Sequence, residues 1–74
     1  MAGRGELKAQ LAEAEMHVSA CAHAVETQAA VVVHLKRHGL DHAEAQRLLA
    51  QYHEGALAAV ARREEVRRQL DRCQ

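Results

Sequence analysis

The sequence contains no proline, tryptophan or phenylalanine, and Tyr52 is the only aromatic residue among its 74 positions. Alanine, leucine, glutamate, arginine and glutamine dominate instead, which favours helix along almost the whole chain. The longest apolar runs, residues 29–33 and 56–61, are far too short to span a bilayer. No apolar segment typical of a signal peptide follows residues 1–6. We therefore expect a single helical domain over residues 1–74, located in the cytoplasm.

The chain also lacks an excess of charge of either sign. Ten basic and ten acidic residues cancel, so no global field attracts nucleic acid or an anionic membrane. There is no glycine-rich phosphate loop, no nucleophile elbow and no paired-cysteine redox motif. These absences argue against an enzyme, and the favoured interpretation needs no cofactor.

The clearest local signal is a helix stop within residues 38–44. Gly39 can adopt the left-handed conformation that ends many helices. With His38 as the C-cap residue, Leu35 and Leu40 occupy the two positions whose apolar contact accompanies a Schellman ending.

A helix start follows directly after this stop. Asp41 is a good N-cap residue, and Glu44 stands three residues later, at the spacing of a capping box. A connection this short joins antiparallel neighbours. We therefore expect helices over about residues 6–38 and 42–72, with residues 1–5 frayed.

Apolar residues recur at alternating spacings of three and four on both sides of this turn, the period of coiled coils and antiparallel bundles. Residues 56–61 are apolar on every side, and the flanks of residues 22–31 become apolar too. Two helices have no interior to cover such surfaces. The expected fold class is therefore all-α, an antiparallel helical hairpin that assembles as a homodimeric four-helix bundle. The expected oligomer interface consists of Ala22, Val25, Ala29, Val32, Leu49, Tyr52, Ala56 and Ala59.

Two polar residues interrupt the apolar series. Gln28 is expected opposite Tyr52, whose hydroxyl would bond the amide and help to fix the register. Arg63 is expected near Glu13 or Glu15.

The two cysteines, Cys21 and Cys73, fall at different heights of the expected hairpin. They are separated by roughly 20 Å at a rise of ~1.5 Å per residue, beyond the reach of a disulfide. We expect both to be reduced, with a bridge between two chains as the alternative.

Histidine is unusually frequent, with six residues. His34 and His38 have the i,i+4 spacing that places two metal ligands on one helical face, and His42 begins the next helix. A zinc-type site of His34, His38 and His42 is the alternative functional interpretation. His17 and Cys21 have the same spacing and form a weaker candidate pair. Most of the histidines occupy outward positions, where no ligand is required.

Nucleic-acid binding is a third interpretation, because arginines gather near the C-terminus. Six acidic residues occupy the same end of the hairpin, and no aromatic platform is available for base stacking. A solvated, mixed-charge end is the better explanation. The arginines concerned are Arg62, Arg63, Arg67, Arg68 and Arg72.

The overall pattern resembles a group of short bacterial helical-hairpin proteins to which no activity is attached. The resemblance implies a hairpin fold and nothing about chemistry. Residues 19–33 and 56–61 are richer in alanine and valine than the corresponding segments of that group, which fits either a tighter oligomer interface or a redesigned core. The function we expect is a small oligomerisation or protein-interaction module. The resemblance rests on residues 10–18, the Gly39-x-Asp41-x-x-Glu44 turn, the Ala45-Gln46-Arg47-Leu48-Leu49 element and the arginine-rich end through Leu70.

Overall fold

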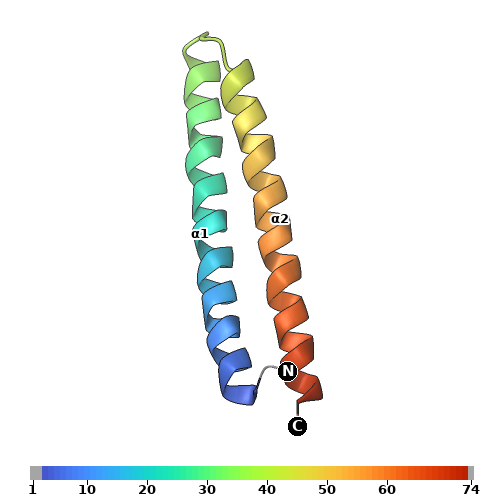
Figure 1. Ribbon diagram of the computed structural model, residues 1–74. Coiled ribbons are helices and arrows are strands. Elements are labelled where there is room, and N and C mark those ends of the chain that lie inside the picture. Colours follow the sequence, from blue (N-terminus) through green and yellow to red (C-terminus); the bar gives the residue numbers. More distant parts are fainter. Residues whose placement is uncertain (1–2, 74) are drawn as a thin grey trace.

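The computed structural model describes residues 3–73, which form two helices and the turn between them. Helix α1 spans Arg4–Arg37 and helix α2 spans Ala43–Arg72. They lie antiparallel and side by side along their whole length (Figure 1). The predicted all-α hairpin is therefore confirmed.

The start of α1 differs from the prediction. Arg4 and Gly5 are helical rather than frayed, and the backbone N–H of Leu7 donates to the carbonyl of Gly3 at 3.0 Å, which closes the first turn. Met1 and Ala2, the rest of the segment expected to fray, lie outside the described residues. Leu7 is buried against α2, and this packing holds the first turn in place although no side chain caps it.

The end of α1 is the predicted Schellman motif. Gly39 has a φ of +65°, the left-handed conformation, and His38 is the C-cap residue. The N–H of Leu40 donates to the carbonyl of Leu35 at 2.9 Å, and the N–H of Gly39 donates to that of Lys36 at 3.2 Å. These are the 6→1 and 5→2 bonds that define the motif.

The start of α2 lies one residue later than predicted. His42 has φ −126° and ψ 9°, which is not helical, so it occupies the N-cap position and Ala43 is the first helical residue. Asp41 still pairs one free backbone N–H at this helix end, because its Oδ1 accepts a hydrogen bond from the N–H of Ala43 at 3.1 Å. The Glu44 carboxylate does not complete a capping box; it accepts instead from Arg47 at 2.7 Å.

The core is a single narrow seam between the two helices. Within residues 3–73 five residues are buried, and only Val66 is completely inaccessible. The remaining positions of the predicted three-and-four series are mostly half-buried, as expected where two helices meet without a third. The buried residues are Leu7, Ala14, Val32, Ala59 and Val66.

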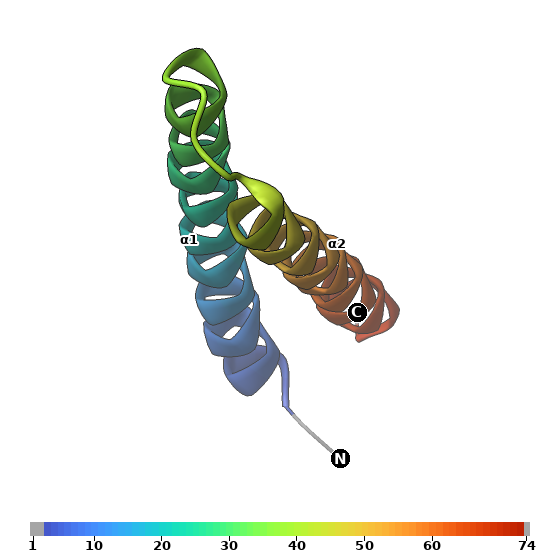
Figure 2. The same cartoon turned by 90° about the horizontal axis from the view of Figure 1, so that it is seen from above.

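The hairpin is a narrow rod of nearly equal width in both directions across its axis. Its extents are 56 × 14 × 13 Å and its radius of gyration is 16.7 Å, against about 11 Å for a compact domain of this length. Seen from above the turn, α1 and α2 form one layer, and no third element covers either side within the described residues (Figure 2). Neither of these two helices is long and apolar enough to cross a membrane.

Candidate interaction surface

Exposed apolar side chains lie on both flanks of the seam, Val31 and Leu48 on one and Val60 on the other. On one flank, Glu15 of α1 and Arg67 of α2 form an ion pair with a separation of 3.6 Å, which fixes these positions on the same side of the hairpin. Positions recurring every seven residues from Gln10 and from Leu48 therefore share the opposite flank. We call this flank the Val31 face; it consists of Gln10, His17, Ala24 and Val31 on α1 and of Leu48, Gly55, Arg62 and Gln69 on α2.

The half of the Val31 face nearer the turn is apolar. Val31 is 40% exposed and Leu48 36% exposed. They lie at similar heights, roughly 24 Å and 28 Å from the Glu15–Arg67 pair at ~1.5 Å per residue of helix. Ala24 and Gly55 continue this surface toward the middle of the rod without adding a bulky or charged group. These four residues form an apolar strip, of which Val31, Leu48 and Gly55 are exposed and Ala24 is half-buried.

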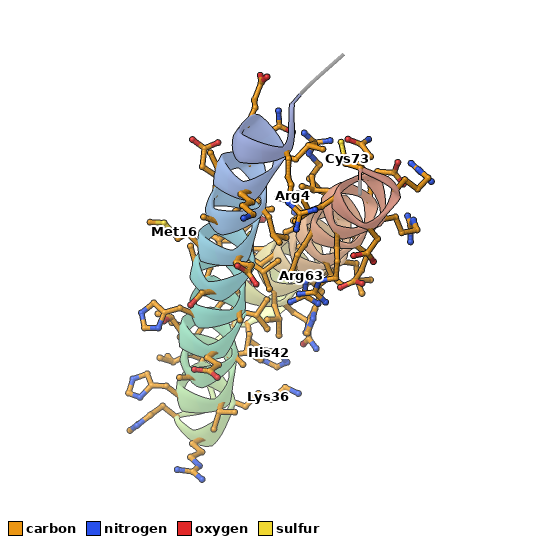
Figure 3. All side chains as sticks on the ribbon, turned by 90° about the horizontal axis from the view of Figure 1, so that it is seen from below. Arg4, Met16, Lys36, His42, Arg63 and Cys73 are labelled. Carbon is orange, nitrogen blue, oxygen red and sulfur yellow. The ribbon has the colours of Figure 1, made fainter. Side chains whose placement is uncertain are left out.

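Other exposed apolar side chains lie away from this strip. Met16 is 73% exposed and projects from α1 on the side facing away from α2 (Figure 3). Val33 is 46% exposed, and its spacing of two residues from Val31 places it on a different face of α1. Leu57 is 72% exposed on the outer surface of α2. Isolated residues of this kind are normal on protein surfaces. Val60, 36% exposed, lies seven residues before Arg67 and so on the flank of the Glu15–Arg67 pair.

The residues predicted to form an oligomer interface lie for the most part inside the hairpin's own seam. Val32 and Ala59 are buried between α1 and α2, and four others are half-buried there: Val25, Ala29, Leu49 and Ala56. Ala22 and Tyr52 are exposed, Tyr52 by 38%. The predicted set does not include Val31 and Leu48, which are exposed beside the seam. The signal that could have identified them is their seven-residue spacing from Ala24 and Gly55, one position beside the seam.

Gln28 makes a different contact from the one predicted. Its amide nitrogen donates to the backbone carbonyl of Ala45 in the first turn of α2, at 2.9 Å, rather than meeting the hydroxyl of Tyr52. The side chain reaches toward the turn, while Tyr52 points partly into solvent. The bond still joins the two helices, so Gln28 keeps its predicted structural role with another partner.

The C-terminal arginines are matched by glutamates. Arg63 pairs with its neighbour Glu64 at 3.0 Å, not with Glu13 or Glu15 as predicted, and Glu15 pairs with Arg67 instead. Arg67 also contacts Glu64 at 3.4 Å. Arg68 and Arg72 both face Glu65, at 2.8 and 3.8 Å. Four of the five arginines therefore lie in a mixed-charge network.

Glu65 is the centre of the outer part of this network. A hydrogen bond from Arg68 lowers the pKa of its carboxyl group below the usual 4.5, and a second hydrogen bond from Gln69 and the nearby charges act in the same direction, against a small opposing effect of burial. The carboxylate is therefore ionised through the neutral range and holds the arginines of the last turns of α2.

Two of the three histidines of the predicted zinc site lie together. The rings of His34 and His38 have centroids 4.4 Å apart. His42 is turned toward the chain reversal, with its Nδ1 3.3 Å from the carbonyl oxygen of Leu40. Within residues 3–73 no three histidine, cysteine or acidic side chains of one chain converge on a common point.

The second predicted pair, His17 and Cys21, is in direct contact. The Sγ atom of Cys21 lies 3.6 Å from Nε2 of His17 and 4.0 Å from its Nδ1. Cys21 is half-buried at the edge of the seam, and His17 is an exposed member of the Val31 face. Cys21 and Cys73 are both free thiols, in agreement with the prediction of no disulfide within the chain.

Comparison of the chain with protein-family models, curated proteins and solved structures finds no match. The arguments about function that follow therefore rest on the geometry of the hairpin.

Proposed function

We propose that this chain is a small oligomerisation module whose working form is a homodimeric four-helix bundle, with the Val31 face at the centre of the interface. The observation that carries the proposal is the deficit of buried surface. Five of the described residues are buried, while Val31 and Leu48 on the Val31 face remain exposed. A second copy would supply the layer that the hairpin lacks.

The amount of exposed surface supports a partner of this size. The chain exposes 5405 Å², whereas a compact monomer of 8.2 kDa exposes about 4,500 Å². The excess, about 900 Å², is close to the ~800 Å² that each partner buries in a standard interface. A second hairpin of equal length offers a matching area along the whole rod.

A second copy fits better than an unrelated partner for two reasons. The Val31 face carries neither a run of like charge nor an aromatic pocket that would select an oppositely charged or peptide-like ligand. In addition, its apolar strip combines Val31 and Leu48 with the small residues Ala24 and Gly55, which allow close packing of like against like about a two-fold axis. The proposal includes a cytoplasmic location with reduced thiols and assigns no catalysis.

Sedimentation equilibrium at micromolar concentration, in a chelating and reducing buffer, tests this proposal. The wild-type chain is expected at twice its 8.2 kDa mass. Val31→Glu and Leu48→Glu are each expected to weaken the dimer at least about tenfold, equivalent to 1.4 kcal/mol, because each buries a charge in an apolar interface.

Val33→Glu and Leu57→Glu are the matched controls. They introduce the same charge on the same two helices, at residues that are at least as exposed but lie off the Val31 face. Both are expected to leave the dimer unchanged. A helical wild-type monomer would overturn the proposal, and equal weakening by Val31→Glu and Val33→Glu would overturn the assignment of the face.

A further inference from the structure

The contact between His17 and Cys21 has the geometry of half a metal site. Two donors bound to one tetrahedral zinc ion at ~2.3 Å for sulfur and ~2.05 Å for nitrogen lie about 3.5 Å apart. The separation of Cys21 Sγ and His17 Nε2 is 3.6 Å. The two side chains therefore stand at the mutual distance that a shared tetrahedral ion imposes, before any ion is bound.

The donor types also define the class of ion. A thiolate with an imidazole suits zinc and other borderline-soft divalent ions, and does not suit calcium or magnesium, which take oxygen ligands. Two ligands leave a tetrahedral shell half empty. Within the described residues of one chain no third histidine, cysteine or acidic group joins them, so the missing ligands must come from outside the chain.

The position of the pair along the rod makes a second copy the natural source. Cys21 lies near the midpoint of α1, which spans Arg4–Arg37. Any two-fold dimer whose rods overlap fully, whether parallel or antiparallel, brings this level of one copy opposite the same level of the other. His17 also belongs to the Val31 face, the face assigned to the dimer contact.

We propose that two copies of the chain together bind one zinc ion, with His17 and Cys21 of each copy forming a tetrahedral His2Cys2 site on the two-fold axis. This inference rests on the proposed dimer. Binding releases the thiol proton of each Cys21 to solvent as the zinc–sulfur bonds form, with no change of oxidation state. The ion would then link the two rods at mid-height, where the apolar strip ends.

The other histidine pair does not meet these conditions. His34 and His38 lie at the turn end of α1, so only a parallel dimer would bring the two copies of that pair together, whereas an antiparallel dimer would hold them at opposite ends of the assembly. They also provide no thiolate. A double variant, His34→Gln with His38→Gln, therefore serves as a control that removes incidental binding by the turn end.

The test is titration of the reduced, metal-free chain with cobalt(II) and zinc(II), combined with sedimentation equilibrium in chelator and in zinc. Wild-type protein, the His34→Gln/His38→Gln control and Cys73→Ser are expected to bind one ion per two chains. Cobalt is expected to give a thiolate charge-transfer band and the strong visible absorption of a tetrahedral complex. Cys21→Ser should abolish the band, and His17→Gln should weaken zinc binding at least about tenfold.

The outcomes separate this inference from the proposed function. A dimer in chelator that binds no metal, or that forms only a disulfide between two Cys21 residues under oxidising conditions, would overturn the zinc site and leave the dimer intact. A stoichiometry of one ion per chain would also overturn it. A monomer in chelator that dimerises with zinc through Cys21 would support the site and overturn the apolar dimer. A monomer under both conditions would overturn both.

Discussion

The side-chain amide of Gln28, in the last third of α1, donates to the backbone carbonyl of Ala45, in the first turn of α2, at 2.9 Å. This bond joins the two helices close to the turn, where the carbonyl of Ala45 already belongs to the helical ladder and can accept a second donor. The amide is part-buried, so the bond also satisfies a polar group that would otherwise lose its water. Gln28 thereby fixes the height of α2 relative to α1 at the upper end of the rod.

Replacing Gln28 should show how much this bond contributes. Gln28→Ala is expected to lower the free energy of unfolding by about 1 kcal/mol, the usual net value of one hydrogen bond. Gln28→Leu should be close to neutral, because leucine fills the seam and leaves no polar group unpaired. Urea denaturation at fixed protein concentration measures both, and Gln51→Ala, at an exposed position, is the control. A larger loss for Gln28→Leu than for Gln28→Ala would contradict this account.

Gly39 should be sensitive to any side chain although there is room for one. An added Cβ would meet nothing within 4 Å, but the φ of +65° is costly for other residues. Gly39→Ala is therefore expected to destabilise the hairpin by about 1 kcal/mol. Gly5→Ala, at a helical position that is equally open, should have the opposite sign and stabilise by up to about 0.5 kcal/mol. Thermal unfolding followed by circular dichroism compares the two variants. A change in stability of the same sign in both would contradict this explanation.

Exposure, not side-chain size, should decide the effect of core truncations. Val66 is 0% exposed, whereas the larger Leu57 is 72% exposed. Val66→Ala is expected to cost about 2 kcal/mol, because it removes fully buried methyl groups and leaves a cavity. Leu57→Ala should stay within about 0.5 kcal/mol of the wild type. Denaturant midpoints at equal protein concentration measure both changes.

The pKa of Glu65 gives a prediction about pH. Because its folded-state pKa lies below the usual 4.5, Glu65 contributes stability that is present above pH 4.5 and is lost as the pH falls through the lowered value. Arg68→Gln removes the main cause and should return the pKa of Glu65 toward 4.5. Carboxyl carbon NMR titration of Glu65 measures the shift. Arg47→Gln, which breaks the Glu44 pair at the other end of the molecule, should leave the pKa of Glu65 unchanged.

The turn and the seam could be predicted from the sequence because their determinants are local. A glycine that permits positive φ, a Schellman pair and a three-and-four apolar series each act over a few residues, and the helix bounds were correct to within two positions. The N-cap residue is His42 and not the predicted Asp41. The assignment depends on the backbone angles of His42, which the residue types at positions 41 and 42 do not determine.

The contacts between the helices could not be predicted as well, because they depend on the exact height of α2 beside α1. Glu15 meets Arg67, one helical turn beyond the predicted Arg63. Long side chains add to the uncertainty: Gln28 extends along the seam toward Ala45 instead of crossing it to Tyr52. The sequence does not single out the Val31 face for a related reason, since the apolar series identifies the seam but does not distinguish between the two flanks beside it. The His17–Cys21 contact agrees with the sequence, because residues four apart on a helix are neighbours on one face.

The closed turn and the long antiparallel pair give the molecule a mechanical property. The rod is 56 Å long, and a flexible glycine–serine chain would need on the order of a hundred residues to reach that distance on average. Here one 34-residue helix covers most of it and its partner stiffens it along the whole length. Gly39 and Leu40 stand exposed at the far tip, while α1 begins and α2 ends at the opposite end (Figure 1). The rod therefore keeps its turn at a fixed distance from its other end, as a rigid spacer does.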